Sequence, residues 1–233
     1  METALVIAWI VVLLVLQPVV GWLGRKRTAA ARGPRRRMYL SSALGIASIG
    51  MITLGIDLFT GSFALKAVLG SLAPRRLALL SAVMLGVCIV LWLAIQLLRK
   101  VRRRGPGPAY VALLPRTPLE KVVFSANSLW AGLIEEYAYR GFCLLNLKAL
   151  TGSWGIAFAL TSVGFGFGHA YQGDGAAIRT SLIGAVLAVP VILTGSVLPS
   201  MIGHAVLDLL TGLWGFRLFT SWGLVPDAIP AED

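Results

Sequence analysis

Ionisable residues inside apolar segments carry the chemistry that this sequence suggests. The stretch 131–140, AGLIEEYAYR, has two adjacent acids, Glu135 and Glu136, followed by Arg140. Charged groups at membrane depth are expensive and usually mark a functional path or site. A positioned glutamate can take up and release a proton, which is the core of general acid–base catalysis. The alternative for this stretch alone is a structural ion pair beside a protonated glutamate.

The only two histidines of the chain follow in later apolar segments. His169 has Phe165 one helical turn before it, and His204 has Asp208 one turn after it, on the same helical face. A single histidine in such a segment is often a structural hydrogen-bonding group. Here three separate segments supply Glu, His and His with Asp, which predicts a convergent polar site.

Helical spacing assigns different directions to the two glutamates. Glu136 and Arg140 are four residues apart, so they share a face and can pair. Glu135 is rotated by about 100° from its neighbour on a helix of 3.6 residues per turn. It can therefore point elsewhere while Glu136 is neutralised.

The composition indicates lipid as the solvent of the segments that hold these residues. The 233 residues are 57% hydrophobic and 13% charged, with mean hydropathy +0.81, whereas soluble domains have about 25% charged residues. The net charge of +11 comes largely from basic runs at 24–37 and 99–108, which flank apolar runs. This placement argues against nucleic-acid binding. By the positive-inside rule, both basic loops are predicted to be cytoplasmic and the N-terminus to face outward.

Apolar runs of this length predict an all-α fold, a polytopic transmembrane helix bundle with about seven spans. The first three spans and the two basic loops form an accessory segment, 1–118, and the polar residues lie in a working segment, 119–233. Small residues in the working segment allow helices to approach closely. We expect the shared site to need staggered or broken helices, at Pro190 or in the glycine-rich 164–168. The predicted spans are 4–23, 39–59, 77–98, 120–147, 154–170, 178–197 and 199–219, with a short interfacial helix in the outer loop 60–76.

Three ordered motifs resemble those of the CPBP family of intramembrane proteases, also called the CAAX-protease and bacteriocin self-immunity family. EEYAYR fits EExxxR, FGFGH fits FxxxH, and HAVLD fits HxxxN/D. The resemblance covers about residues 119–216, and some bacterial members, such as the myxosortase branch, process C-terminal sorting tails or peptide precursors. It implies an intramembrane endopeptidase with catalytic Glu135, His169, His204 and Asp208, supported by Glu136, Arg140 and Phe165.

Peptide hydrolysis needs an activated water, a stabilised oxyanion and a proton for the leaving amine. The resemblance implies that Glu135 and His169 activate water and that His204 faces the oxyanion. The familiar CAAX endopeptidase has Asn at the place of Asp208. An ionised Asp cannot donate a hydrogen bond to an oxyanion, whereas a protonated buried Asp can, so Asp208 either assists at the oxyanion or instead orients His204.

A zinc site is the alternative mechanism. Glu135, His169 and His204 are acceptable zinc ligands, and catalytic zinc commonly has three protein ligands plus water. No HExxH motif occurs in the sequence. The residues alone do not separate the two mechanisms, and we favour a metal-free, glutamate-dependent hydrolase without a cofactor mainly because the resemblance implies it.

Other functions remain open for the same residues. Intramembrane Glu, His and Arg also build proton-coupled transporters, although the paired broken helices of an inverted repeat are not evident. A non-catalytic immunity or scaffold protein is a further alternative. The expected partners are membrane lipids and a membrane-anchored protein or peptide substrate, with no nucleic acid. The Arg, Ala and Gly bias suggests a GC-rich genome, so we expect a multi-pass protein of the bacterial inner (plasma) membrane.

Overall fold

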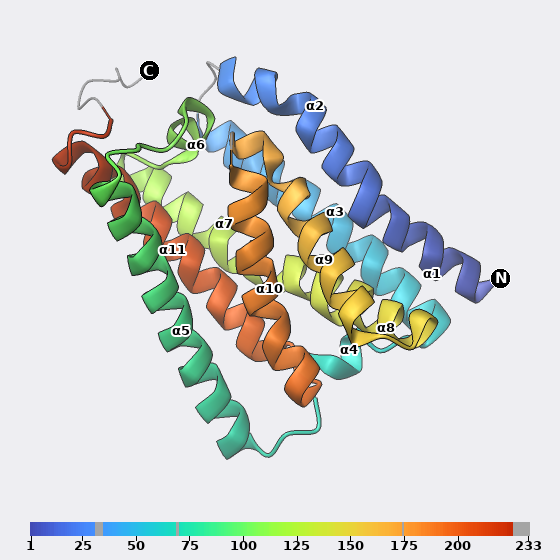
Figure 1. The fold of residues 1–233 in the computed structure, drawn as a ribbon. Helices are drawn as coiled ribbons and strands as arrows, with labels where there is room; N and C mark the ends of the chain where they lie inside the picture. The colour runs from blue at the N-terminus through green and yellow to red at the C-terminus, as the bar shows by residue number, and fades with distance from the viewer. Residues whose placement is uncertain (31–34, 69, 174, 226–233) are drawn as a thin grey trace.

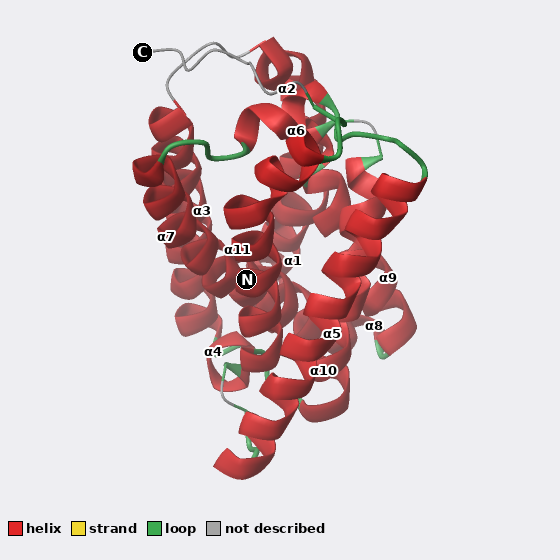
Figure 2. Cartoon of the chain, turned by 90° about the vertical axis from the view of Figure 1, so that its left-hand side faces the viewer, coloured by secondary structure: helices red, strands yellow, loops and turns green. Residues whose placement is uncertain are grey.

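Helices form the described part of the chain, as Figures 1 and 2 show. The computed structural model describes residues 1–30, 35–68, 70–173 and 175–225, with only the backbone described for 24–30. No strand occurs in these ranges. The prediction of an all-α helical bundle is therefore confirmed.

The first apolar run is one continuous helical segment with a π turn in it. α1 (Glu2–Val11) leads into the π-helix η1 (Val12–Leu16) and then α2 (Gln17–Ala30). Pro18 has no N–H, and its ring clashes with the carbonyl four residues earlier in a regular α-helix. A π turn just before the proline is one of the known causes of a helix bend.

The next helices complete the N-terminal segment. α3 (Arg35–Thr60) and α5 (Pro74–Val101) are long, and the short α4 (Ala64–Ala67) and α6 (Pro108–Leu113) follow them. α4 is the short helix predicted in the outer loop. α6 was not predicted, because a single short turn flanked by prolines resembles a linker in sequence.

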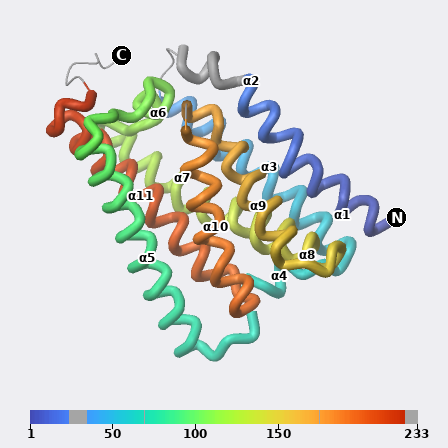
Figure 3. The backbone as a smooth tube through the Cα atoms, viewed as in Figure 1, coloured from blue at the N-terminus to red at the C-terminus, as the bar shows by residue number. Residues whose placement is uncertain are grey.

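The C-terminal segment begins with the helix that carries the glutamates. A capping box of Thr117 and Glu120 starts α7 (Pro118–Glu136). The helical path continues through the π-helix η2 (Tyr137–Leu144) into α8 (Leu145–Thr151), as Figure 3 traces. It ends at Gly152, whose φ of 69° is left-handed, a conformation that favours glycine.

The remaining helices are α9 (Trp154–Gly168), the 3₁₀ turn η3 (Ala170–Gln172), α10 (Ala176–Thr194) and α11 (Leu198–Ser221). α9 has 15 residues and rises only about 22 Å, less than the ~30 Å hydrocarbon core. α10 continues through Pro190. The predicted helix break therefore falls at the end of α9 rather than at Pro190.

Four helical segments of the described chain are long and apolar enough to cross a membrane. α9 is apolar but shorter, and α7 and α11 include the charged residues of the site. The apolar helices support an integral membrane protein, and the number of about seven spans stays a prediction. The four are Glu2–Leu23, Arg35–Thr60, Pro74–Val101 and Ala176–Thr194.

α11 packs against both α5 and α7, while α3 packs against α7 and α9 against α10. Glycine permits close approach at these contacts. A Cβ added at Gly132 of α7 would lie 2.8 Å from the backbone nitrogen of Ala205 in α11. Helices of the two predicted segments thus pack into one bundle, and the division at residue 118 stays a prediction.

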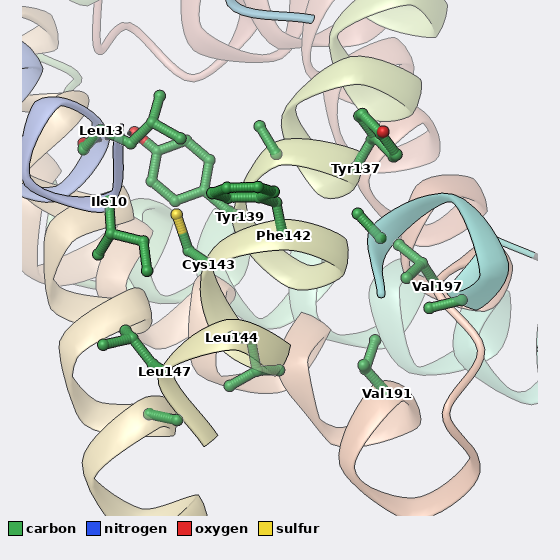
Figure 4. Packing of buried hydrophobic residues seen from close by; sticks show 14 of the residues in the cluster. Ile10, Leu13, Tyr137, Tyr139, Phe142, Cys143, Leu144, Leu147, Val191 and Val197 are labelled. Carbon is green, nitrogen blue, oxygen red and sulfur yellow. Dashed lines mark hydrogen bonds between the residues drawn. The ribbon is translucent and has the colours of Figure 1, made fainter. Parts of the chain in front are cut away.

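A buried cluster surrounds η2 and joins it to the first helix. Phe142, Cys143 and Leu144 have no exposed surface, and Figure 4 shows Tyr139 and Cys143 next to Leu13. The Tyr139 hydroxyl donates to the carbonyl oxygen of Leu13 at 3.1 Å. This packing fixes the helical turn that follows the glutamates.

The described ends of the predicted cytoplasmic loops lie at one end of the bundle (Figure 1). At the start of α3, Arg35 Nε donates to the carbonyl of Ala112 at 3.2 Å, and the Tyr39 hydroxyl donates to that of Leu113 at 2.9 Å. The side chains of 24–34 lie outside the described residues. The shared end agrees with two basic loops on one side, and which side is cytoplasmic stays a prediction.

Candidate active site

Glu136 is the centre of a buried polar network. Its Oε1 accepts a hydrogen bond from Arg140 Nη1 at 2.8 Å and lies 2.9 Å from His204 Nδ1. Arg140 Nη2 also donates to the carbonyl of Gly184 in α10 at 2.9 Å. Glu136 and Arg140 are both fully buried. The predicted pairing of Glu136 with Arg140 is present, and it ties α7 and η2 to α10 and α11.

His204 lies between two carboxylates. A carboxylate accepts hydrogen bonds, so Nδ1 of His204 donates its proton to Glu136. The opposite ring nitrogen, Nε2, lies 3.7 Å from Asp208 Oδ2, which is beyond hydrogen-bond distance. Glu136 therefore makes the hydrogen bond that orients the ring, and the role of Asp208 stays a prediction.

Glu135 faces the other histidine. His169 Nε2 lies 3.7 Å from Glu135 Oε2, and both side chains are mostly buried. His169 Nδ1 lies 2.8 Å from the carbonyl oxygen of Phe165. A carbonyl only accepts, so Nδ1 carries a proton, and Nε2 is the ring nitrogen that faces Glu135. The buried Oε2 of Glu135 has no hydrogen-bond partner within the described chain.

Phe165 connects the two halves of the site. Its ring centroid lies 4.7 Å from that of His169 and 5.6 Å from that of His204. The guanidinium carbon of Arg140 lies 4.2 Å from the Phe165 ring centroid, a cation–π distance. The ring is 1% exposed, so it fixes both histidines and the arginine by packing.

The π-helix η2 begins at the residue after Glu136. Single π turns within α-helices often occur at functional sites. Because a π turn holds more residues than an α turn, it changes the direction of the side chains that follow the glutamates. No periodicity of apolar residues distinguishes this turn in the sequence.

A cavity of about 780 Å³ brings these side chains to one surface. Its lining includes Glu135, His169, His204 and Asp208 from α7, the end of α9 and α11, together with the Phe165 ring. Glu136 and Arg140 are not in the lining and lie behind it. The structure thus brings together all the predicted site residues, four at the cavity wall with Phe165 and two in support.

Several polar residues of the cavity were missed in the sequence. Asn127 lies eight residues before Glu135, so both share a face of α7, and this spacing could have indicated it. Tyr171 is two residues after His169 and stacks on its ring at 6.1 Å. Arg99 and Arg179 line the same cavity, but they come from distant parts of the chain, and no local pattern connects them with the motifs.

The fit of a metal ion depends on the spacing of the donor atoms. No group of three His, Cys, Asp or Glu side chains in the described residues is arranged to hold a metal ion. His204 Nδ1 is paired with Glu136 and His169 Nδ1 with a backbone carbonyl, so Nε2 is the free nitrogen of each ring. As arranged, Glu135, His169 and His204 do not form a group of that kind, and the metal-free mechanism stays a prediction.

Comparison with known families agrees with this geometry. Residues 117–210 match the family model described as Type II CAAX prenyl endopeptidase Rce1-like, which confirms the predicted resemblance to the CPBP family of CAAX proteases. No curated protein and no solved structure matched the chain. The family match supports intramembrane protease activity, and the myxosortase branch stays a prediction.

Proposed function

We propose that the chain is an intramembrane endopeptidase that hydrolyses a peptide bond in a membrane-anchored protein or peptide. The observation that supports this most is the single cavity lined by Glu135, His169, His204 and Asp208. A bacterial inner membrane, with lipids as its surroundings, is the location that we propose with it.

Glu135 and His169 are the pair that activates water in this proposal. Their facing atoms are 3.7 Å apart, which is too far for a direct hydrogen bond. In this proposal one water molecule bridges them. Glu135 accepts the water proton as the water attacks the carbonyl carbon, and then donates it to the leaving amine. This is one general base that becomes the general acid.

His204 stabilises the oxyanion. Its Nδ1 donates to Glu136, so only Nε2 can face the substrate, and Nε2 needs its own proton to donate to an oxyanion. Carboxylates near both nitrogens provide partners for that doubly protonated ring. In this proposal Glu136 fixes the position of His204, Asp208 stabilises its positive charge, and His204 makes the hydrogen bond to the oxyanion.

The decisive experiment is membrane proteomics of cells that carry either the wild-type chain or Glu135→Ala. We expect one or a few membrane proteins to have a cleavage-generated terminus in wild-type cells that is missing from Glu135→Ala cells. Gly86→Ala is the matched control, because a Cβ there meets no atom within 4 Å, and it should retain every terminus. A Glu135→Ala strain with unchanged termini would refute proteolysis, and ion flux that depends on a pH gradient would then favour transport.

We also propose that hydrolysis needs no bound metal. Once a substrate is known, cleavage by the purified protein should persist at full rate after prolonged incubation with a strong chelator. Elemental analysis of the treated, active protein should find no stoichiometric zinc. Loss of activity on chelation, with recovery on adding zinc, would instead support the zinc mechanism.

A further inference from the structure

Two arginines outside the proposed catalytic set line the same cavity as Glu135. Arg99 lies near the C-terminal end of α5 and Arg179 in the first turns of α10. Their guanidinium carbons lie 5.2 Å and 5.0 Å from the centroid of one ring, that of Tyr110 in α6. The ring therefore holds two like charges next to each other at the cavity wall.

Within the part of the chain that the structure describes, these two positive charges lack a carboxylate partner. Among the described residues, no Asp or Glu lies within ion-pair distance of either arginine. Arg179 Nη2 donates to Gln172 Oε1 at 3.2 Å, and Arg99 Nη1 is buried without a hydrogen-bond partner. Both arginines are partly buried, and a charge removed from water is normally paired, so this pair of arginines suits an anion that the described residues do not supply.

A neighbouring amide adds a second unpartnered polar group to this part of the cavity wall. Gln96, one helical turn before Arg99, is 5% exposed, and its Oε1 has no partner in the described chain. It lines the same cavity. An amide oxygen only accepts hydrogen bonds, so this orphaned atom suits a donor, such as a peptide N–H of a bound substrate, and not the carboxylate itself.

The charges of the cavity differ along its length. α6, the C-terminal end of α5 and the N-terminal end of α10 meet at one end of the bundle (Figure 1). α7 starts at that end and carries Glu135 in its last turn. Glu135 and Asp208 repel an acidic group from the catalytic end, while Arg99 and Arg179 attract it to the other.

We propose that Arg99 and Arg179 bind a carboxylate of the peptide substrate and thereby set which bond reaches Glu135. This rests on the proposed endopeptidase function. Guanidinium groups bind carboxylates with two parallel hydrogen bonds. The carboxylate comes either from an acidic side chain or from the C-terminus of the substrate, and both sources offer the same chemistry to the two arginines.

The test uses one apolar peptide in four versions, with the full-length protein purified in detergent. The first pair differs only at the C-terminus, which is free in one version and amidated in the other. The second pair is amidated and differs only at one internal residue, which is Glu in one version and Gln in the other. Binding is measured with dye-labelled peptides on Glu135→Gln protein, and cleavage with wild-type protein by mass spectrometry. We expect one carboxylate version to bind about tenfold or more tightly than its neutral match, as charge-assisted hydrogen bonds allow.

The variants locate the preference. Arg99→Gln and Arg179→Gln, each made in the Glu135→Gln background, should bind charged and neutral versions equally, and Arg99→Lys should retain part of the preference. Lys100→Gln is the matched control. Lys100 is the neighbour of Arg99, its Nζ lies 5.2 Å from the centroid of the Trp222 ring, and it is not in the lining of this cavity. The Lys100→Gln protein should therefore keep the full preference for the carboxylate versions. Melting curves identify any variant that fails to fold. If Arg99→Gln fails to fold, the binding preference of Arg99→Lys is compared with that of Lys100→Gln instead.

The outcomes separate the two proposals. If the protein prefers the charged peptides in binding but cleaves no version, the carboxylate site is supported and the endopeptidase function is contradicted. Cleavage with equal binding of charged and neutral versions retains the endopeptidase and overturns the site. A preference that persists in both arginine variants also overturns it, because the anion is then held elsewhere. If the free C-terminus is preferred, the chain end is the source, and if the internal Glu is preferred, a side chain is.

Discussion

Two adjacent glutamates have different surroundings because a helix turns by about 100° between them. Glu136 points into the bundle, where Arg140 and His204 both bind the same oxygen. Glu135 points to the cavity and its Oε2 has no partner among the described residues. The buried pair with Arg140 is therefore structural, while the lone acid is available to react.

Glutamine at either position separates these roles. Glu136→Gln leaves Arg140 buried without a counter-charge, and breaking a buried ion pair costs about 3–5 kcal/mol. We expect Glu136→Gln protein in detergent to have a clearly lower melting temperature than wild type, with unfolding measured by fluorescence. Glu135→Gln should melt close to wild type, since Oε2 of Glu135 has no partner among the described residues that the change could break, yet it should abolish cleavage. Equal melting of the two variants would contradict this division.

Phe165 is expected to stabilise the site through its ring face. Phe165→Leu removes the cation–π contact with Arg140, which is worth up to about 2 kcal/mol when desolvated. We expect a loss of about 1–3 kcal/mol, measured as a shift of the thermal or denaturant midpoint. Phe167→Leu is the control, because Phe167 is two residues away and 50% exposed, so a shift of similar size there would refute the assignment.

At the scale of elements, the contact between α7 and α11 sets the distance between the glutamates and His204. Gly132 is one turn before Glu136, and Ala205 follows His204. Their close approach brings the two backbones near enough for a direct carboxylate–imidazole bond. The length of this bond therefore depends on the absence of a side chain at residue 132.

Gly132→Ala should disturb this contact. Its Cβ would lie 2.8 Å from backbone and side-chain atoms of Ala205, so α11 must move away. Overpacking of this kind costs about 1–3 kcal/mol, and we expect cleavage to fall more than stability, because His204 moves with α11. In Gly86→Ala the added methyl group meets open space, and both cleavage and melting temperature should stay at wild-type values.

The local parts of the site could be predicted from the sequence, and the long-range parts could not. Helical spacing is enough to pair Glu136 with Arg140 and to turn Glu135 away from them. The bond from Glu136 to His204 joins residues 68 positions apart, and it depends on how α7 and α11 pack. The π-helix η2 and the arginine Arg99, contributed by the N-terminal segment, likewise follow from packing that no spacing of residues encodes.

At the scale of the whole molecule, the helices of the N-terminal segment complete the cavity. α3 and α5 contribute lining residues such as Tyr39, Trp92 and Gln96, although the family match begins only at residue 117. The segment predicted as accessory thus supplies walls of the candidate site. It also brings Arg99 to the end of the bundle at which the described ends of both basic stretches lie.

The positive-inside rule makes a direct prediction about that end. If it is cytoplasmic, a cysteine in the loop after α5 is cytoplasmic and one in the loop between α3 and α5 is external. Arg104→Cys and Ser71→Cys test this, because both positions are exposed and both native cysteines, Cys88 and Cys143, are buried. A membrane-impermeant maleimide should label Ser71→Cys in intact spheroplasts and Arg104→Cys only in inside-out vesicles. Wild-type protein, treated in parallel, should stay unlabelled. The reverse pattern would put Arg99 and Arg179 at the outer face, so that a substrate acid would have to reach them from outside the cell.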